Sequence, residues 1–405
     1  MYKKIIDQKN INVSTLGYLL LLTSSIVRMG ACIYIPALPV IGKDLAISDA
    51  DMNLTLTVYF TVFSLFILIC GPLSDAFGRK FLIQLGAVVF IIGSFICGES
   101  TSLSYLITGR IIQAIGASMI PGTSRAMIRD IASDTEVISL LGWMAVLGGL
   151  LMVGAPILGG FITENYHWSY NFWLLVAFTS LILIIISYFL PETLIAEKRI
   201  KLNLTPVLIT YKKMMLAPDF FLVILPVALC FVIQGVYLAT APFIFIKNFM
   251  MTPAQFGLSN IAIVIALTLG RYISVNMVKY YSNKTAYITG AIITLIAGGM
   301  FTVVGIGGYE NIYTLLIGIS IFGIGFGTIA PIGLKSSITA FRKTSGMAAA
   351  LQGCLVLGGT AIGSAGIALM MQHSELLPMK ILSISMAIVT AFIFFTALIS
   401  KEKLV

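Results

Sequence analysis

The sequence predicts an all-α membrane protein with twelve transmembrane helices arranged in two six-helix halves. Of the 405 residues, 59% are hydrophobic and 10% are charged, and the mean hydropathy is +1.02. Soluble domains carry far more charge than this. Apolar stretches long enough to cross a bilayer, which takes ~20 helical residues, recur along the chain. A polar break near the middle separates six of them from the other six.

The first apolar stretch begins near Thr15 and is longer than the hydrophobic region of a cleaved signal peptide, which has about 7–15 residues. We therefore expect it to remain as the first membrane helix. The twelve expected spans are 15–41, 52–72, 81–98, 102–122, 137–162, 170–190, 219–245, 256–278, 285–305, 311–334, 345–371 and 378–399.

The distribution of positive charge predicts the orientation. With the N-terminus inside, only Lys43, Lys247 and Lys380 of the 25 Lys and Arg residues fall outside, and Arg28 and Arg110 lie within spans. All the others face the cytoplasm, as the positive-inside rule requires. We therefore expect an inner-membrane protein with both termini in the cytoplasm. The net charge of +9 needs no nucleic-acid partner to explain it.

The polar break divides the chain into an N-terminal half (1–190), a cytoplasmic linker (191–218) and a C-terminal half (219–405). If the halves are related, similar residues should recur at a fixed offset.

Such echoes occur at an offset of 210 residues. Pro121 corresponds to Pro331, and Arg125 corresponds to Lys335. Arg125 and Lys335 are among the positive charges counted above as cytoplasmic. The sequence Val-Leu-Gly-Gly occurs at 146–149 and again at 356–359. In carriers built from parallel repeats, the substrate binds between the halves near the midplane.

The stretch between the second and third spans reads GPLSDAFGRK. Its Gly71 and Gly78 permit a close backbone approach and a tight turn. Asp75 can cap a helix or pair with a cation across the seam between the halves, and Arg79 and Lys80 help to hold the loop in the cytoplasm.

In the fourth span, Arg110, Gln113 and Gly116 are spaced three residues apart. This spacing places them on one helical face, which we expect to look into a central cavity.

The fifth span is rich in small residues. These let neighbouring helices approach, and a proline can bend the span. The residues of this pattern are Gly148, Gly154, Pro156, Gly159 and Gly160.

These motifs resemble those of a known family. GPLSDAFGRK matches the loop signature G-x-L-x-D-x-x-G-R-K of the major facilitator superfamily at every defined position. The fourth span resembles its R-x-x-Q-G-x-G motif, with Ala114 in place of the first Gly. The fifth span resembles the drug/proton antiporter motif ending G-P-x-x-G-G, with Ala155 replacing a Gly. Together they resemble the Bcr/CflA-like group. The resemblance implies the major facilitator fold, a loop that latches the outward-facing state, and proton-driven export of small organic molecules.

The sequence departs from that group in the first span. There the group commonly reads Asp-Met-Tyr-Leu-Pro, whereas this chain begins the match with Cys32 and has no carboxylate. None of the 16 Asp and Glu residues lies deep in an expected span, and both His lie in expected external loops. Asp51 and Glu99, at outer helix ends, are the remaining candidates for proton coupling. The substrate could also carry the proton, and anion exchange and facilitated diffusion stay open.

The intramembrane arginines suggest a substrate class, because charge within the membrane is costly. Arg28 and Arg110 would make the cavity electropositive, favouring an anion such as a carboxylate metabolite or a siderophore. Alternatively, both arginines bond to carbonyls and polar neighbours and hold helices together. The other residues expected to line the cavity are Cys32, Tyr34, Tyr59, Gln113, Met144, Gln234, Tyr237, Asn260 and Gln352.

Several functions remain in competition with export of an anion. They are multidrug efflux of neutral or cationic compounds, anion exchange, import, and a sensor that shares the fold but transports nothing. An enzyme is not expected, because no Asp, Glu or His lies at membrane depth to act on a substrate. The five Cys have no metal-ligand spacing, so we expect no metal and no cofactor. The expected partners are a small organic substrate, protons and the lipid bilayer, with the monomer as the functional unit.

Overall fold

The computed structural model describes residues 13–308, 311–373, 378–400 and 404. In these residues, 12 helices are long and apolar enough to cross a membrane, which confirms the predicted fold class. The spans are α2 (Val13–Cys32) with α3 (Leu38–Asp44), α4 (Asp49–Phe77), α5 (Arg79–Gly98), α6 (Leu103–Ile131), α7 (Asp134–Asn165), α8 (Tyr170–Phe189), α10 (Pro218–Phe243), α11 (Pro253–Tyr280), α12 (Asn283–Gly307), α13 (Ile312–Thr339), α14 (Ser345–His373) and α15 (Pro378–Ser400).

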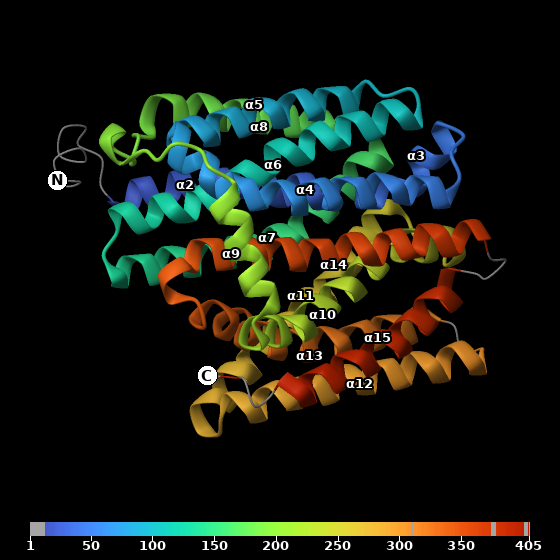
Figure 1. Cartoon of the computed structure of the whole chain (residues 1–405). Helices are drawn as coiled ribbons and strands as arrows, with labels where there is room; N and C mark the ends of the chain where they lie inside the picture. The colour runs from blue at the N-terminus through green and yellow to red at the C-terminus, as the bar shows by residue number, and fades with distance from the viewer. Residues whose placement is uncertain (1–12, 309–310, 374–377, 401–403, 405) are drawn as a thin grey trace.

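The helices form two bundles, one from α2 to α8 and one from α10 to α15 (Figure 1). The bundles meet where α4 lies against α14 and where α7 lies against α11. The linker carries one short helix, α9 (Thr205–Leu216), which runs crosswise to the spans in Figure 1. We call the end of the bundle that carries the linker the linker end, and the opposite end the far end. Helix α2 begins and α15 ends at the linker end (Figure 1).

The apolar pattern predicted one continuous helix for the first span, but the structure shows an interrupted one. Helix α2 ends at Cys32 and is followed by a 3-10 turn, Ile35–Ala37, and by α3. Pro36 and Pro39 lie in this segment and cannot donate a backbone hydrogen bond, so the α-helix is interrupted there.

Other helices extend beyond their apolar stretches. Helix α4 continues to Phe77, although its apolar run ends near residue 72. The stretch predicted to be a loop is therefore mostly helical, and only Gly78, with φ of 104°, separates α4 from α5. A helix satisfies its own backbone groups, so it can continue where the side chains become polar.

Beside Gly78, a carboxylate from the start of the linker caps the N-terminus of α5. The carboxylate of Glu192 accepts hydrogen bonds from the amides of Arg79, at 3.0 Å, and Lys80, at 3.2 Å. These are first-turn amides of α5, which lack acceptors within the helix. A Cβ at Gly78 would lie 2.5 Å from this carboxylate. Glycine is therefore required here by both conformation and space.

The rest of the signature stretch is also held by the N-terminal half and the start of the linker in this conformation. Arg79 pairs with Asp130, and it lies 3.6 Å from Asp75. The carbonyl of Asp75 accepts a hydrogen bond from the amide of Ile200, at 3.1 Å. At Gly71, by contrast, a Cβ would meet nothing within 4 Å. The close approach predicted at Gly71 is therefore wrong for this conformation.

The far end is closed by polar bonds between the two halves. Lys247 pairs with Asp49 at 2.6 Å, and Gln372 donates to Asp51 at 3.1 Å. The amide of Ala254 donates to Glu164 at 3.3 Å.

Glycines bring the far ends of α7 and α11 together. A Cβ at Gly160 would overlap the carbonyl of Pro253 in the opposite half, and one at Gly257 would lie 2.6 Å from the carbonyl of Pro156. A Cβ at Gly159 would overlap the carbonyl of Ile33. The last two glycines of the fifth-span motif thus lie where the far end is sealed.

Candidate functional site

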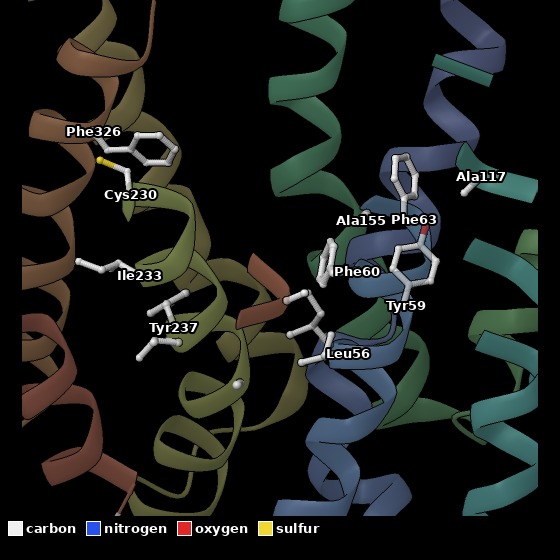
Figure 2. Packing of buried hydrophobic residues seen from close by; sticks show 14 of the residues in the cluster. Leu56, Tyr59, Phe60, Phe63, Ala117, Ala155, Cys230, Ile233, Tyr237 and Phe326 are labelled. Atoms are coloured by element: carbon white, nitrogen blue, oxygen red, sulfur yellow. The ribbon is translucent and has the colours of Figure 1, made fainter. Parts of the chain in front are cut away.

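A cavity of about 810 Å³ lies between the halves, lined by α2, α4, α6 and α7 on one side and α10, α11, α13 and α14 on the other. Figure 2 shows α4, with Tyr59 and Phe63, on one side of this space and α10, with Tyr237, on the other. A second cavity of about 640 Å³ adjoins it at the linker end. The two share Ile67, Arg125 and Ala349 in their walls. The central cavity therefore opens toward the linker end, while the far end is closed.

The charged residues in the wall of the central cavity are Arg28, Arg125 and Lys335; no Asp, Glu or His is among the described residues that line it. Arg28 and Lys335 have no ion-pair partner in the described part of the chain. Arg125 donates to the carbonyl of Pro121, in its own helix, at 3.2 Å. The cavity therefore carries an uncompensated positive charge.

Arg28 projects from α2 beside a glycine of α7. A Cβ at Gly148 would lie 3.4 Å from Nε of Arg28 and 3.6 Å from its Cζ. Glycine at this position leaves one side of the guanidinium uncovered, so a ligand can approach it.

The remaining wall is largely apolar and aromatic, with Phe60, Phe231 and Phe326 among its members. Tyr59 and Tyr237 line it from opposite halves, and the hydroxyls of both are buried without a hydrogen-bond partner in the part of the chain that the structure describes. An unmade hydrogen bond is costly to bury, and neither hydroxyl reaches the cavity surface in this conformation.

Most of the residues predicted to line the cavity do so. Two of them also make hydrogen bonds within the C-terminal half. Asn260 donates to the carbonyl of Phe256 at 2.9 Å, and Gln352 donates to the carbonyl of Leu334 at 2.8 Å. The predicted residues found in the wall are Arg28, Cys32, Tyr59, Met144, Gln234, Tyr237, Asn260 and Gln352.

Tyr34, Arg110 and Gln113 lie behind the wall and are fully buried. The Cζ atom of Arg110 lies 4.2 Å from the ring centroid of Tyr34 and 3.9 Å from that of Tyr59. Arg110 also donates to the carbonyl of Gly30, at 3.1 Å, and to Gln113. Its Nε and Nη2 atoms have no hydrogen-bond partner among the described residues. Arg110 thus supports the cavity wall through Tyr59 and does not form its surface.

The predicted direction of this helical face is therefore corrected. Gln113 donates to Ser94 of α5 at 2.8 Å, and a Cβ at Gly116 would overlap the backbone of Phe90 in α5. The face turns toward α5 because its glycine allows the two helices to pack closely.

Arg125 and Lys335 were missed as cavity residues. Both lie just beyond an apolar run and were counted with the cytoplasmic charges, but α6 and α13 continue past them to Ile131 and Thr339. Their equivalence in the internal repeat was the signal that could have identified them, because related positions in two parallel halves face a common axis.

The antiporter-like motif is divided between two places. Pro156 lines the cavity, and the glycines after it seal the far end. A Cβ at Gly154 would meet nothing within 4 Å. Among the described residues, no group of three or more His, Cys, Asp or Glu is placed to hold a metal ion.

Residues 20–247 match the family described as the Major Facilitator Superfamily. The chain is 26% identical over 399 residues to the uncharacterized MFS-type transporter YdgK of Bacillus subtilis, with 96% of each chain covered. It is 25% identical over 365 residues to Multidrug resistance protein D of Escherichia coli, with 88% of each covered.

Solved structures show the same fold. A D-xylose-proton symporter is similar with a TM-score of 0.76 and 17% identity, covering 96% of this chain and 97% of that one. A bacterial homolog of the human lysosomal transporter Spinster, in an inward-facing and unoccupied conformation, is similar with a TM-score of 0.74 and 14% identity, covering 97% and 98%.

Proposed function

Because the chain belongs to the major facilitator superfamily, we propose that it moves a small organic anion across the cytoplasmic membrane by alternating access. The observation that carries this proposal is the central cavity, in which Arg28, Arg125 and Lys335 have no acidic neighbour among the described lining residues. Such a cavity attracts anions and repels cations, and its low-dielectric walls strengthen both effects.

Arg28 is the proposed primary ligand of the substrate. A guanidinium binds a carboxylate or phosphate through two parallel hydrogen bonds, and Gly148 leaves room beside it. The aromatic wall around Phe231 and Phe326 suits an apolar body attached to the anionic group. A carboxylate metabolite or a siderophore has this combination.

The direction of transport follows from the orientation proposed above. If the linker end is cytoplasmic, as the positive charges favour, this conformation faces the cytoplasm and would receive a substrate for export. We assign the protein on this basis, and on its motifs, to the Bcr/CflA-like exporters. Flux measurements in the two directions test this assignment, because preferential uptake into cells would make the protein an importer.

The test uses purified protein in proteoliposomes, with citrate and p-aminohippurate as organic anions and ethidium as a cation. We expect transport of at least one anion, and we expect Arg28→Gln to weaken it while Arg28→Lys retains part of it. Lys380→Gln, an exposed change outside the cavity, is the control for removing one positive charge. Transport of ethidium but of neither anion would contradict the proposal, and no flux of any compound would favour a sensor.

Proton-coupled efflux of neutral or cationic drugs is the second candidate. It is favoured by the similarity to a protein named Multidrug resistance protein D and by the aromatic cavity wall. Asp51, which accepts a hydrogen bond from Gln372 at the far end, and Glu99 are the proposed proton-binding groups in that case. A substrate-dependent change of internal pH in the same vesicles would support this candidate.

A further inference from the structure

Arg125 and Lys335 occupy equivalent positions in the two halves and line the same cavity. Arg125 lies six residues before the end of α6, and Lys335 lies four residues before the end of α13. At 1.5 Å per residue, these positions are ~9 Å and ~6 Å from the helix ends. Both ends are at the linker end, which is the open end in this structure. The two cations therefore lie on opposite sides of the mouth of the cavity.

Nothing in the described part of the chain neutralises this pair. The central cavity has no acidic or histidine side chain in its described wall. Two aspartates line the adjoining cavity, but both lie near Arg79: Asp130 pairs with it and accepts a hydrogen bond from Thr193, and Asp75 lies 3.6 Å away. These carboxylates already have partners within the N-terminal half and the start of the linker.

Alternating access requires the open mouth to close. When the halves approach at the linker end, Arg125 and Lys335 approach each other and lose water, so their repulsion grows. An anion bound between them would turn this repulsion into two attractive contacts. A ligand that binds the closed state better than the open state shifts the equilibrium toward closure.

We propose that the Arg125–Lys335 pair makes closure of the linker end conditional on a bound anion, so that the protein is an anion exchanger. The empty carrier rarely closes, and each return step is made with a second anion, one carried inward for each carried outward. No proton needs to bind in the cavity, which agrees with the lack of acidic groups in its described wall. This inference rests on the proposed anionic substrate.

The experiment compares exchange with net uptake. Proteoliposomes containing the full chain are loaded either with unlabelled p-aminohippurate or with chloride, and uptake of labelled p-aminohippurate is measured. If the test of the proposed function finds that citrate is the only anion transported, citrate is used both inside the vesicles and as the labelled anion. We expect wild-type uptake to be about tenfold faster into the anion-loaded vesicles, a ratio that corresponds to a modest difference in closure between the empty and loaded carrier.

The variants separate a closure role from simple substrate binding. Lys335→Gln should raise net uptake into chloride vesicles and bring the ratio close to one, whereas Lys335→Arg should keep the wild-type ratio. Arg125→Gln, at the equivalent position, should act like Lys335→Gln and serves if that variant does not fold. Lys380→Gln is the matched surface control and should behave as wild type.

The outcomes also separate this inference from the proposed function. Equal wild-type uptake into both kinds of vesicle would overturn the exchange mechanism while leaving anion transport intact. Loss of exchange and net uptake together in Lys335→Gln and Arg125→Gln would make these residues ordinary substrate ligands and would also overturn it. If wild-type protein neither binds nor transports the anions, the proposed function itself fails.

Discussion

The hydroxyl of Tyr211 donates a hydrogen bond of 2.8 Å to the carbonyl of Leu68. Leu68 precedes Pro72 by four residues in α4, and proline has no amide to offer that carbonyl. The linker helix α9 thus supplies the donor that the membrane helix lacks. Tyr211 is buried, and the bond ties the linker to the N-terminal half.

Tyr211→Phe should therefore lower the stability of the protein. The change leaves the Leu68 carbonyl without its donor, at a cost of about 1 kcal/mol, which thermal unfolding in detergent will measure. In a Pro72→Ala background the helix supplies its own amide, so the same change should cost less. Tyr281→Phe, at an exposed position, is the control. Burial raises the pKa of Tyr211 to about 12, so the hydroxyl stays protonated and the loss of stability should be constant from pH 6 to pH 9. Equal losses of stability with Pro72 and with Ala at position 72 would contradict the role given to the Tyr211 hydroxyl.

The two glycines of the signature stretch should respond differently to alanine. Gly78→Ala should destabilise the protein by about 1–3 kcal/mol, the usual range for an unfavourable backbone conformation, because φ is 104° and the Cβ would meet Glu192. Gly71→Ala should be neutral or slightly stabilising, because position 71 is helical and a Cβ there meets nothing. Thermal unfolding of both variants tests this; similar losses would show that Gly71 is also confined.

Enlarging residue 148 should weaken anion binding. A Cβ at Gly148 touches Arg28 at an ordinary contact distance, so Gly148→Ala should bind nearly as wild type does. Gly148→Leu should push the guanidinium aside and lower the affinity for p-aminohippurate by about tenfold, which is ~1.4 kcal/mol. Gly149→Leu is the matched control, because a Cβ there meets nothing within 4 Å. Binding can be measured by titration calorimetry, and an equal loss in the Gly149 variant would contradict the role of Gly148.

Alanine at Gly160 should separate the halves at the far end, since its Cβ would overlap the carbonyl of Pro253. Spin labels at Tyr166 and Met250, which are exposed in opposite halves near that end, report the separation in a cysteine-free background. We expect the population with the longer distance to rise by roughly fivefold, equivalent to ~1 kcal/mol. Gly154→Ala should leave the distances unchanged. An unaltered distribution in the Gly160 variant would show that the seal does not depend on this contact.

The sequence predicted the fold well because lipid imposes a simple requirement on each span. Twelve apolar runs of sufficient length predicted the twelve helices, and the loop signature predicted the family. The ends of the helices were less predictable. Helix α6 continues to Ile131 although its apolar run ends near residue 122, since backbone hydrogen bonding does not depend on apolar side chains.

The site was predicted only in part, because helical spacing groups residues on a face but does not say what that face meets. The spacing of Arg110 and Gln113 was read correctly, yet the face packs against α5 and against tyrosine rings. Arg28 was found because its charge stands alone in an apolar run. Arg125 and Lys335 were missed since a charge at the end of such a run looks like an orientation signal, and only the helix continuation places both in the cavity.

The cap that Glu192 provides for α5 has a practical consequence for dividing the chain. A fragment ending at residue 190 would lack both this carboxylate and Ile200, whose amide bonds to the carbonyl of Asp75. The first part of the linker therefore belongs structurally to the helices before it. Two co-expressed fragments should reassemble best when the cut falls at Leu202, which is exposed. The N-terminal fragment then keeps Glu192 and Ile200, and the bond from Tyr211 to Leu68 forms between the two fragments.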